Sequence, residues 1–98
     1  WPARPAWTPA ARGDLRSIWL YSYENWGCDQ ADAYTDAIEA ACRSLAHGTS
    51  AWRRVEGRDS YCKRVVRSHV IYVRDLADRV EVIRILHVRR DPDNLLDE

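Results

Sequence analysis

The stretch that decides the fold is residues 61–87, which read YCKRVVRSHVIYVRDLADRVEVIRILH. Three runs within it, 61–66, 69–74 and 80–87, are rich in Val, Ile and Tyr, and the breaks between them are short and polar. β-branched and aromatic residues favour strands, and short polar breaks are typical of turns between antiparallel strands. The stretch therefore predicts an antiparallel β-meander over 61–87. One face of such a sheet must be buried against other elements, and the segments with helical patterns that precede it are the candidates for this packing.

A helix is predicted directly after Thr8 and Pro9. Thr8 can cap the helix with its hydroxyl, and Pro9 has the backbone angle that suits the first helical position. The residues of one face then recur at helical spacing. They are Ala11, Leu15, Ile18, Trp19, Ser22 and Trp26. Gly27 is the expected end of this helix, because glycine readily takes a left-handed backbone conformation.

A second helical pattern follows after a very short break. It begins at Cys28 or Asp29, and Asp29 is the better capping residue. Its stripe consists of Ala31, Tyr34, Ile38, Cys42 and Leu45. Gly48 is expected to end it. A break of about one or two residues makes the two helices antiparallel neighbours, so residues 8–47 are predicted to form a helix hairpin.

The remaining segments are less regular. Residues 1–7 contain two prolines, which lack the N–H donor, so they are predicted to form an extended arm or an edge strand. Residues 48–60 show no clear period and are expected to form a surface loop, with Trp52 folding back over the edge of the core. Residues 91–98 begin with a turn signal and form a short acidic tail with one apolar pair. The whole chain, 1–98, has the size of one domain.

Composition and cysteine usage narrow the class of protein. The chain is 46% hydrophobic and 31% charged, which is typical of a globular protein and not of a disordered one. No apolar run approaches the roughly 18–20 residues of a membrane helix, and no secretory signal opens the chain, so a cytoplasmic protein without a membrane partner is predicted. Cys28, Cys42 and Cys62 form no C-x-x-C pair, so neither a disulfide framework nor a metal site is expected. Cys42 and Cys62 are expected in the core or the sheet.

The charges sum to zero but are unevenly spread along the chain. Residues 1–50 hold four Arg and six acids, a net charge of −2. Residues 51–90 hold eleven Lys and Arg and five acids, a net charge of +6, and residues 91–98 hold four acids and no base, a net charge of −4. The basic meander half suits an acidic partner, either nucleic acid or an acidic protein segment. The alternative is a solvated basic face whose positive charge is balanced by the acidic tail of the same chain.

The sequence contains no Gly-rich phosphate loop, no nucleophile elbow and no metal-ligand cluster, so no cofactor is expected. A metal-free RNA-cleaving site would need an arginine to stabilise phosphate charge, and an acid and a base within reach of the reacting oxygens. Arg67, Arg84 and His87 could fill these roles, but no carboxylate base is clearly placed. His69 and His87 lie in predicted strands, where they either face each other or are separated by the sheet.

Short motifs run through nearly the whole chain in a characteristic order. The first helix contains Thr8-Pro9-Ala10-Ala11, Asp14-Leu15, Ile18-Trp19 and Trp26-Gly27, and the second contains Ala31 and Tyr34. The meander contains Ser68-His69-Val70-Ile71-Tyr72, then Ile83-Arg84-Ile85-Leu86-His87 with Arg89 and Asp91. In order and spacing, these motifs resemble the ParE branch of the ParE/RelE superfamily of bacterial toxins. The chain departs from that pattern at Arg67, where the family often has Gly, at Val73, where an aromatic residue is usual, and at Arg90, where an apolar residue is common.

The resemblance implies an α+β fold, with an N-terminal arm or edge strand and an antiparallel helix hairpin packed on a three- to four-stranded antiparallel sheet. It implies a toxin of a bacterial type II toxin–antitoxin system that inhibits DNA gyrase by binding, without catalysis. A ParD-like antitoxin, a ribbon-helix-helix protein with a helical tail, would neutralise it by laying an amphipathic helix between the hairpin and the sheet. The alternatives are a ribosome-dependent mRNA endonuclease of the RelE type that uses Arg67, Arg84 and His87, and an inactive toxin-like chain that keeps only its partner binding.

Two sets of site residues follow from this hypothesis. The residues expected to bind the target are Arg67, Arg84, His87, Arg89, Arg90 and Asp91. The residues expected to bind the antitoxin are Leu15, Ile18, Trp19, Tyr34, Ile38, Tyr72 and Arg74. Neither a metal nor a cofactor is part of either set.

Overall fold

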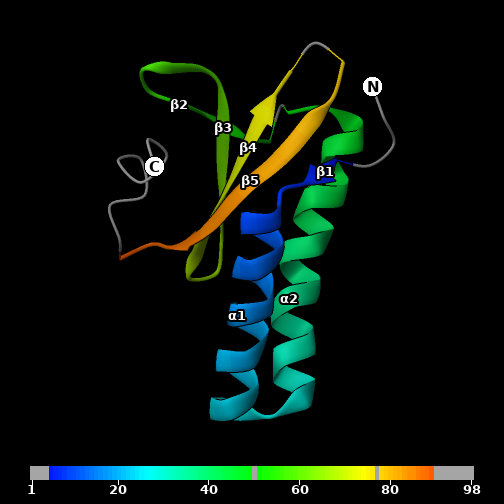
Figure 1. Cartoon of the computed structure of the whole chain (residues 1–98), viewed down its shortest axis with the longest axis vertical. Coiled ribbons are helices and arrows are strands. Elements are labelled where there is room, and N and C mark those ends of the chain that lie inside the picture. Colours follow the sequence, from blue (N-terminus) through cyan, green and yellow to red (C-terminus); the bar gives the residue numbers. More distant parts are fainter. Residues whose placement is uncertain (1–4, 50, 77, 90–98) are drawn as a thin grey trace.

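The structure is a computed structural model that describes residues 5–49, 51–76 and 78–89. Along the chain, the elements are β1 (Ala6–Trp7), α1 (Pro9–Trp26), α2 (Cys28–Arg43), the 3-10 helix η1 (Ser44–His47), β2 (Arg53–Val55), β3 (Arg58–Val66), β4 (His69–Asp75) and β5 (Val80–His87). The two long helices run beside each other, and their far half extends beyond the sheet (Figure 1). The predicted α+β class and helix hairpin are confirmed.

The hairpin begins and turns at residues with specific backbone roles. Thr8 caps α1, and its side-chain oxygen accepts a hydrogen bond from the Ala11 N–H at 3.1 Å. Gly27 has φ 90°, a left-handed value, and its N–H donates to the Tyr23 carbonyl at 2.9 Å. Because Gly27 both ends α1 and precedes α2, the second helix begins at Cys28 without a side-chain cap. Asp29, the capping residue favoured from the sequence, therefore lies inside the first turn, where its carboxylate still faces the positive end of the helix dipole.

The meander of β3, β4 and β5 is also confirmed. β3 pairs antiparallel with β4, and β4 pairs antiparallel with β5. Val66 and His69 face each other across a two-residue turn, in which Arg67 has φ 55°. Favoured two-residue turns between antiparallel strands require positive φ, which costs a residue with a side chain about 1 kcal/mol. Glycine would therefore suit this turn, and Arg67 occupies it under mild strain.

The predicted strand count and strand directions need correction at the two edges of the sheet. The sheet has five strands in the order β1-β5-β4-β3-β2. β1 pairs parallel with β5 at Ala6–Glu81 and Trp7–Val82, and β2, inside the segment predicted as a loop, pairs antiparallel with β3. Strands of two and three residues are too short to show a period of two in the sequence. The parallel pairing of β1 arises only because the rest of the fold forms the long connection that parallel strands require.

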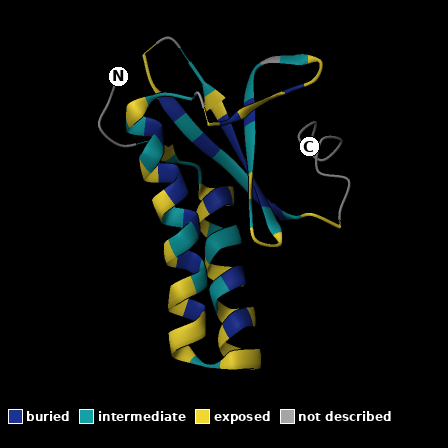
Figure 2. Ribbon diagram, turned by 180° about the vertical axis from the view of Figure 1, so that it is seen from behind, coloured by how far each residue is buried: buried dark blue, intermediate teal, exposed yellow. Residues whose placement is uncertain are grey.

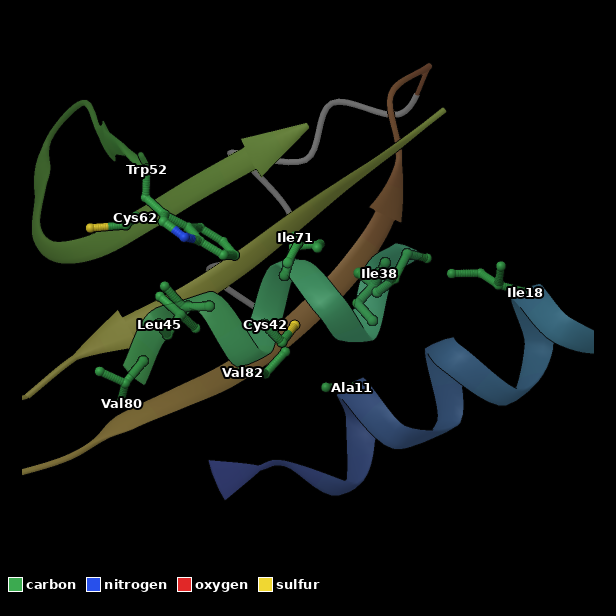
Figure 3. Close-up of a cluster of buried hydrophobic side chains, with 13 residues drawn as sticks. Ala11, Ile18, Ile38, Cys42, Leu45, Trp52, Cys62, Ile71, Val80 and Val82 are labelled. Atoms are coloured by element: carbon green, nitrogen blue, oxygen red, sulfur yellow. The ribbon is translucent and has the colours of Figure 1, made fainter. Parts of the chain in front are cut away.

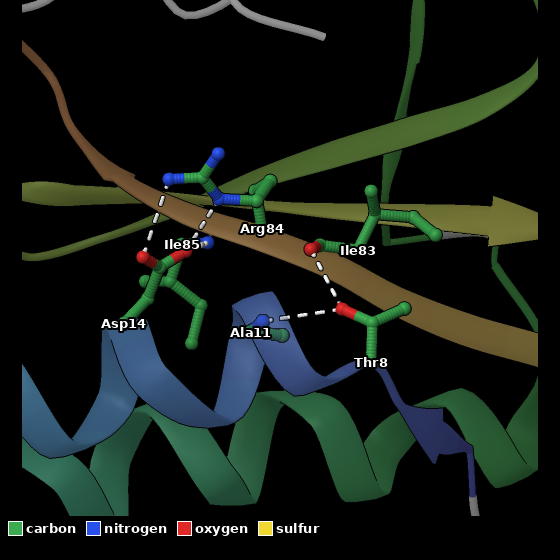
Figure 4. A network of polar contacts seen from close by, with 6 residues as sticks. All are labelled: Thr8, Ala11, Asp14, Ile83, Arg84 and Ile85. Atoms are coloured by element: carbon green, nitrogen blue, oxygen red, sulfur yellow. Dashed lines mark hydrogen bonds and ion pairs between the residues drawn. The ribbon is translucent and has the colours of Figure 1, made fainter. Parts of the chain in front are cut away.

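The start of α1 is attached to the edge of β5 by polar contacts (Figure 4). β1 pairs with only two residues of β5, so the next backbone groups of that edge need other partners. The Thr8 hydroxyl donates to the Ile83 carbonyl at 2.9 Å, and a carboxylate oxygen of Asp14 accepts the Ile85 N–H at 2.9 Å. Because the cap of α1 and a residue of its second turn occupy these groups, the start of the helix covers an edge that would otherwise be open to another strand.

The core lies between the hairpin and one face of the sheet (Figure 3). Its buried residues include Ala11, Ile18, Ile38, Cys42, Leu45, Trp52, Cys62, Ile71, Val80 and Val82. The predicted burial of Cys42, Cys62 and Trp52 is confirmed. Since side chains alternate along a strand, a smaller cluster of Val55, Val70, Tyr72 and Leu86 belongs to the opposite face. Within the described ranges, no helix is long and apolar enough to cross a membrane.

Candidate functional site

A cavity of about 380 Å³ opens where the hairpin leaves the sheet. We name it the hairpin groove. Its lining residues are Ser17, Ile18, Tyr21, Ser22 and Trp26 of α1, Tyr34 of α2, Ser68 of the turn between β3 and β4, His69 of β4 and His87 of β5. One wall is therefore apolar and aromatic, and the other consists of hydroxyl and imidazole groups. A partner that binds here needs an apolar surface with a few polar groups.

The apolar wall continues onto an exposed surface of α1. Tyr21 is 63% exposed and Trp26 is 61% exposed, and their rings contact edge to face with centroids 6.0 Å apart. Leu20 and Tyr23 are also exposed, so this half of the helix shows four large apolar side chains to solvent. Figure 2 shows that exposed residues dominate the end of the hairpin beyond the sheet. A group of large exposed apolar side chains on one part of a surface often marks a site of protein–protein contact.

The polar wall is a connected hydrogen-bond cluster. The Tyr34 hydroxyl lies 2.7 Å from Nδ1 of His69, and it accepts the Ser68 backbone N–H at 3.0 Å. His69 and His87 are directly opposite each other on β4 and β5, and their ring centroids are 5.2 Å apart. Of the two arrangements that the sequence left open, the facing pair is therefore correct. A tyrosine from the hairpin is joined in this way to two histidines from the sheet.

The electrostatic environment of this cluster is neutral inside and positive at its border. Burial lowers the pKa of His69 below its ordinary value, and the neighbouring His87 lowers it further, with a small opposing effect from Asp14. The guanidinium of Arg67 lies over the Tyr34 ring, 5.3 Å from its centroid. The Arg89 backbone N–H donates to Nδ1 of His87 at 3.1 Å. The groove thus has inside it a His69 ring whose lowered pKa favours the neutral form, and two arginines next to its border.

The residues expected to bind an antitoxin do not form one surface. Ile18 and Tyr34 line the hairpin groove. Leu15 and Trp19 line a separate hollow between α1 and α2, where the Trp19 indole N–H donates to Asp32 at 2.8 Å.

The other three members of that set divide between the core and the far face of the sheet. Ile38 in the core is 0% exposed, and Tyr72 in the cluster on the opposite face of the sheet is 1% exposed, so both side chains are buried in this structure. Arg74 is exposed, and its guanidinium lies over the Tyr61 ring, which belongs to the cluster on the face opposite the helices.

Half of the residues expected to bind the target do come together. Arg67, His87 and Arg89 are neighbours at the border of the hairpin groove, where the Val88 N–H also donates to the Ser68 carbonyl at 3.0 Å. Arg90 and Asp91 lie outside the described residues. Tyr21 and Ser17 also line the groove but were not part of the predicted α1 stripe, which contributes Ile18, Ser22 and Trp26 to it.

Arg84 is separated from this group. It pairs with Tyr72 on one face of the sheet, whereas His87 pairs with His69 on the other. Its Nε–H donates to Asp14 at 2.8 Å, and the pair is partly buried. The three residues of the alternative catalytic set, Arg67, Arg84 and His87, are therefore not brought together. In the described part of the chain, no group of three or more His, Cys, Asp or Glu could hold a metal ion.

Comparisons with known proteins agree with this fold. The profile of the family described as the ParE toxin of the type II toxin–antitoxin system parDE matches residues 6–92. A protein named Toxin ParE1 from Mycobacterium tuberculosis is 34% identical over 91 residues, covering 91% of this chain and 93% of its own length. Toxin ParE1 from Caulobacter vibrioides is 36% identical over 78 residues, covering 79% of this chain and 80% of its own length.

A solved structure described as the chromosomal ParDE TA system from P. aeruginosa superimposes with a TM-score of 0.77. It covers 88% of this chain and 96% of its own chain, at 17% identity, so it supports the fold. The family profile extends over most of the sequence, and relatives above 30% identity match most of its length. The chain belongs to the ParE family, the toxins of type II toxin–antitoxin systems.

Proposed function

We propose that this toxin acts by binding DNA gyrase, without catalysing a reaction, and that a ParD-like antitoxin neutralises it in the cytoplasm as a hetero-oligomer. The observation that carries the proposal is the hairpin groove, where an exposed aromatic surface meets a basic border. An exposed aromatic surface suits a protein partner, and a basic border favours an acidic one.

The hairpin groove fits the helical tail of the antitoxin. An amphipathic helix places apolar residues on one face at intervals of three or four, and such helices bind in apolar grooves. Ile18, Tyr21 and Trp26 would contact that face. Tyr21 and Trp26 hold large exposed apolar areas in the free toxin, so their burial would supply much of the binding energy.

The same position explains how the antitoxin would block the toxin. Arg67, His87 and Arg89 stand at the border of the groove and are our candidates for contacts with the target. Arg90 and Asp91 follow them directly in the sequence and remain candidates on that ground. An antitoxin helix in the groove would cover Arg67 and His87, so gyrase and antitoxin would compete for one surface.

The positions of the polar groups support binding over catalysis. Arg84, which the endonuclease alternative needs at a phosphate, is held by the carboxylate of Asp14 on the edge of β5. His87 already accepts the Arg89 N–H through Nδ1, and its neighbour His69 has a lowered pKa. These contacts stabilise the fold and do not converge on one reacting atom.

The target can be tested with purified toxin in a gyrase supercoiling assay. Wild type should inhibit supercoiling, and Arg67→Glu with Arg89→Glu should abolish inhibition, because the border then loses its positive charge. Arg79→Glu is the matched control, since Arg79 is an exposed arginine in the turn at the other end of β4. Undisturbed supercoiling with wild type would remove gyrase as target. New cleavage of mRNA on translating ribosomes, lost in His87→Ala, would establish the endonuclease alternative.

The antitoxin site can be tested by co-purification with the product of the adjacent gene. Tyr21→Asp and Ser17→Arg place a charge on the apolar wall and should abolish the complex while circular dichroism remains unchanged. Glu24→Arg is the control, because Glu24 is exposed on the same helix and does not line the groove. Retention of the complex by both wall variants would exclude the groove as the antitoxin site.

A further inference from the structure

The hydrogen bonds of the polar wall determine where the protons of its two histidines lie. Nδ1 of His87 accepts the Arg89 backbone N–H at 3.1 Å, so this nitrogen carries no proton. A neutral imidazole has one N–H, and in His87 it is therefore Nε2–H. His87 presents a donor, and no acceptor, on its remaining nitrogen.

His69 reaches the same state by a different contact. The Tyr34 oxygen accepts the Ser68 N–H at 3.0 Å, and it lies 2.7 Å from Nδ1 of His69. The Tyr34 hydroxyl proton finds an acceptor if it points to Nδ1 of His69, and this arrangement again puts the His69 proton on Nε2. The lowered pKa of His69 agrees with a neutral ring held in this way. Both rings line the hairpin groove with Nε2–H as their remaining polar group.

The surroundings favour a negatively charged acceptor for these two donors. No acidic side chain is among the described residues that line the groove. The Arg67 guanidinium lies over the Tyr34 ring, so a positive charge lies against the cluster, and the backbone N–H of a second arginine, Arg89, is bonded to His87. A carboxylate offers two oxygens, each of which can accept from a separate donor. A backbone carbonyl or an amide offers a single oxygen and no charge.

We propose that His69 and His87 form a paired N–H donor site that receives a side-chain carboxylate of the antitoxin, and that this contact selects the cognate antitoxin. The inference rests on the proposed docking of the antitoxin in the hairpin groove. The apolar residues of its helix would fill the wall formed by Ile18, Tyr21 and Trp26, and one Asp or Glu of that helix would bond both imidazoles. A partner helix without this acid would leave two buried donors unpaired, which is how hydrogen bonding produces selectivity.

A transition metal is a poorer occupant of the histidine pair. A metal at Nε2 of His87 requires the ring proton to be on Nδ1, where it would oppose the Arg89 N–H. Metal binding would therefore break a bond that the fold already makes. A carboxylate keeps both tautomers as they are.

The test uses variants that separate the two nitrogens of each ring. In His87→Asn the side-chain oxygen takes the place of Nδ1 and can still accept the Arg89 N–H, while the Nε2–H donor is lost. In His87→Gln the amide N–H reaches the Nε2 position and restores the donor. Affinity for the antitoxin encoded beside the toxin is measured by calorimetry with the full chain. We expect His87→Asn and His69→Asn each to weaken binding about tenfold or more, and His87→Gln to recover most of that loss.

A double-mutant cycle then identifies the partner group. Each Asp and Glu of the antitoxin's toxin-binding segment is replaced by its amide, and every variant is measured against wild type and His87→Asn. One acid should lose about as much affinity as His87→Asn, and the two changes together should cost little more than either alone. His47→Asn is the control for removal of an exposed histidine and should bind as wild type.

The outcomes distinguish this inference from the proposed function. The donor site is refuted if both Asn variants bind the antitoxin with wild-type affinity. It is also refuted if the loss of affinity in His87→Asn adds fully to the loss caused by every antitoxin acid replaced. In either case the groove itself can still bind the antitoxin. If Tyr21→Asp and Ser17→Arg also keep full affinity, the docking position is wrong as well. Thermal unfolding of all variants checks that the fold is kept. If His87→Asn has a lower melting temperature than wild type, the affinity of His87→Gln for the antitoxin still tests the donor site.

Discussion

The carboxylate of Asp14 on α1 accepts the Nε–H of Arg84 on β5 at 2.8 Å. The same oxygen accepts the Ile85 backbone N–H at 2.9 Å, and the ion pair is partly buried. One side chain thus neutralises an arginine and occupies an edge group of the sheet. Arg84 belongs to a contact that holds the hairpin on the sheet, which is why its role as a phosphate ligand is not supported.

Asp14→Ala should lower the free energy of unfolding by about 2 kcal/mol, because it removes the carboxylate that accepts from both Arg84 and the Ile85 N–H. Urea denaturation measures the loss. The control is Asp78→Ala, whose partner Arg79 lies in an exposed pair, and it should cost less than about 0.5 kcal/mol. Equal losses in the two variants would show that the Asp14 contact adds nothing beyond a surface ion pair.

Thr8→Val should destabilise the protein by about 1–2 kcal/mol, since it removes both the helix cap and the hydroxyl donor to the Ile83 carbonyl. Thr8→Ser keeps both hydrogen bonds and should retain most of the stability. Chemical denaturation monitored by tryptophan fluorescence compares the two. A valine variant as stable as the serine variant would contradict a bonding role for the hydroxyl.

Stability should fall in mild acid because of His69. Its pKa in the folded protein is lowered from the ordinary value of 6.5, so the unfolded chain takes up this proton first as the pH falls. The contribution of neutral His69 is present above about pH 6.5 and is lost as the pH decreases through the lower folded pKa. Free energies of unfolding at pH 7.5 and pH 5.5 should differ more in wild type than in His69→Asn. An identical pH dependence in both proteins would refute this assignment.

Trp52→Phe should cost less than about 1 kcal/mol. The Trp52 indole N–H is buried and has no hydrogen-bond partner among the described residues, so phenylalanine removes an unsatisfied donor as well as some packing. Trp52→Ala should cost about 3–5 kcal/mol, because it leaves a cavity next to Cys62 and Leu45. Thermal unfolding separates the two cases, and a phenylalanine variant as unstable as the alanine variant would imply a hidden partner for the indole.

Only Cys28 should react rapidly with iodoacetamide in the folded protein at pH 8. Burial raises the pKa of the Cys42 thiol to about 12 and also raises the pKa of Cys62, whereas Cys28 is exposed. The thiolate is the reactive form, so the two buried cysteines are protected both by access and by protonation. Intact mass spectrometry should show one added group in buffer and three in urea. Rapid modification of Cys42 in buffer would mean that the hairpin opens from the sheet.

The hairpin groove was only partly accessible to prediction. Tyr34 and Ile18 were predicted to bind the antitoxin, and both line the groove. Ile38 and Tyr72 were predicted with them, but Ile38 is buried in the core and Tyr72 is buried on the opposite face of the sheet. Helical periodicity indicates which residues share a face of a helix. It does not indicate which face packs on the sheet and which face remains exposed to solvent. Tyr21 and Ser17 lie one step around the helix from the predicted stripe, so the groove they line follows from the angle at which the hairpin leaves the sheet.

By itself the sequence determined the local elements of this protein. Thr8-Pro9 and Gly27 set the limits of α1, the β-branched runs set the meander, and the alternation of apolar residues decided which side chains enter the core. These features depend on interactions between residues close in the chain, and a pattern can record them. Tertiary structure alone decided the parallel attachment of β1, the meeting of Asp14 with Arg84, and the junction of Tyr34 with His69 and His87. Those contacts join residues far apart in sequence, so they exist only once the hairpin has packed on the sheet.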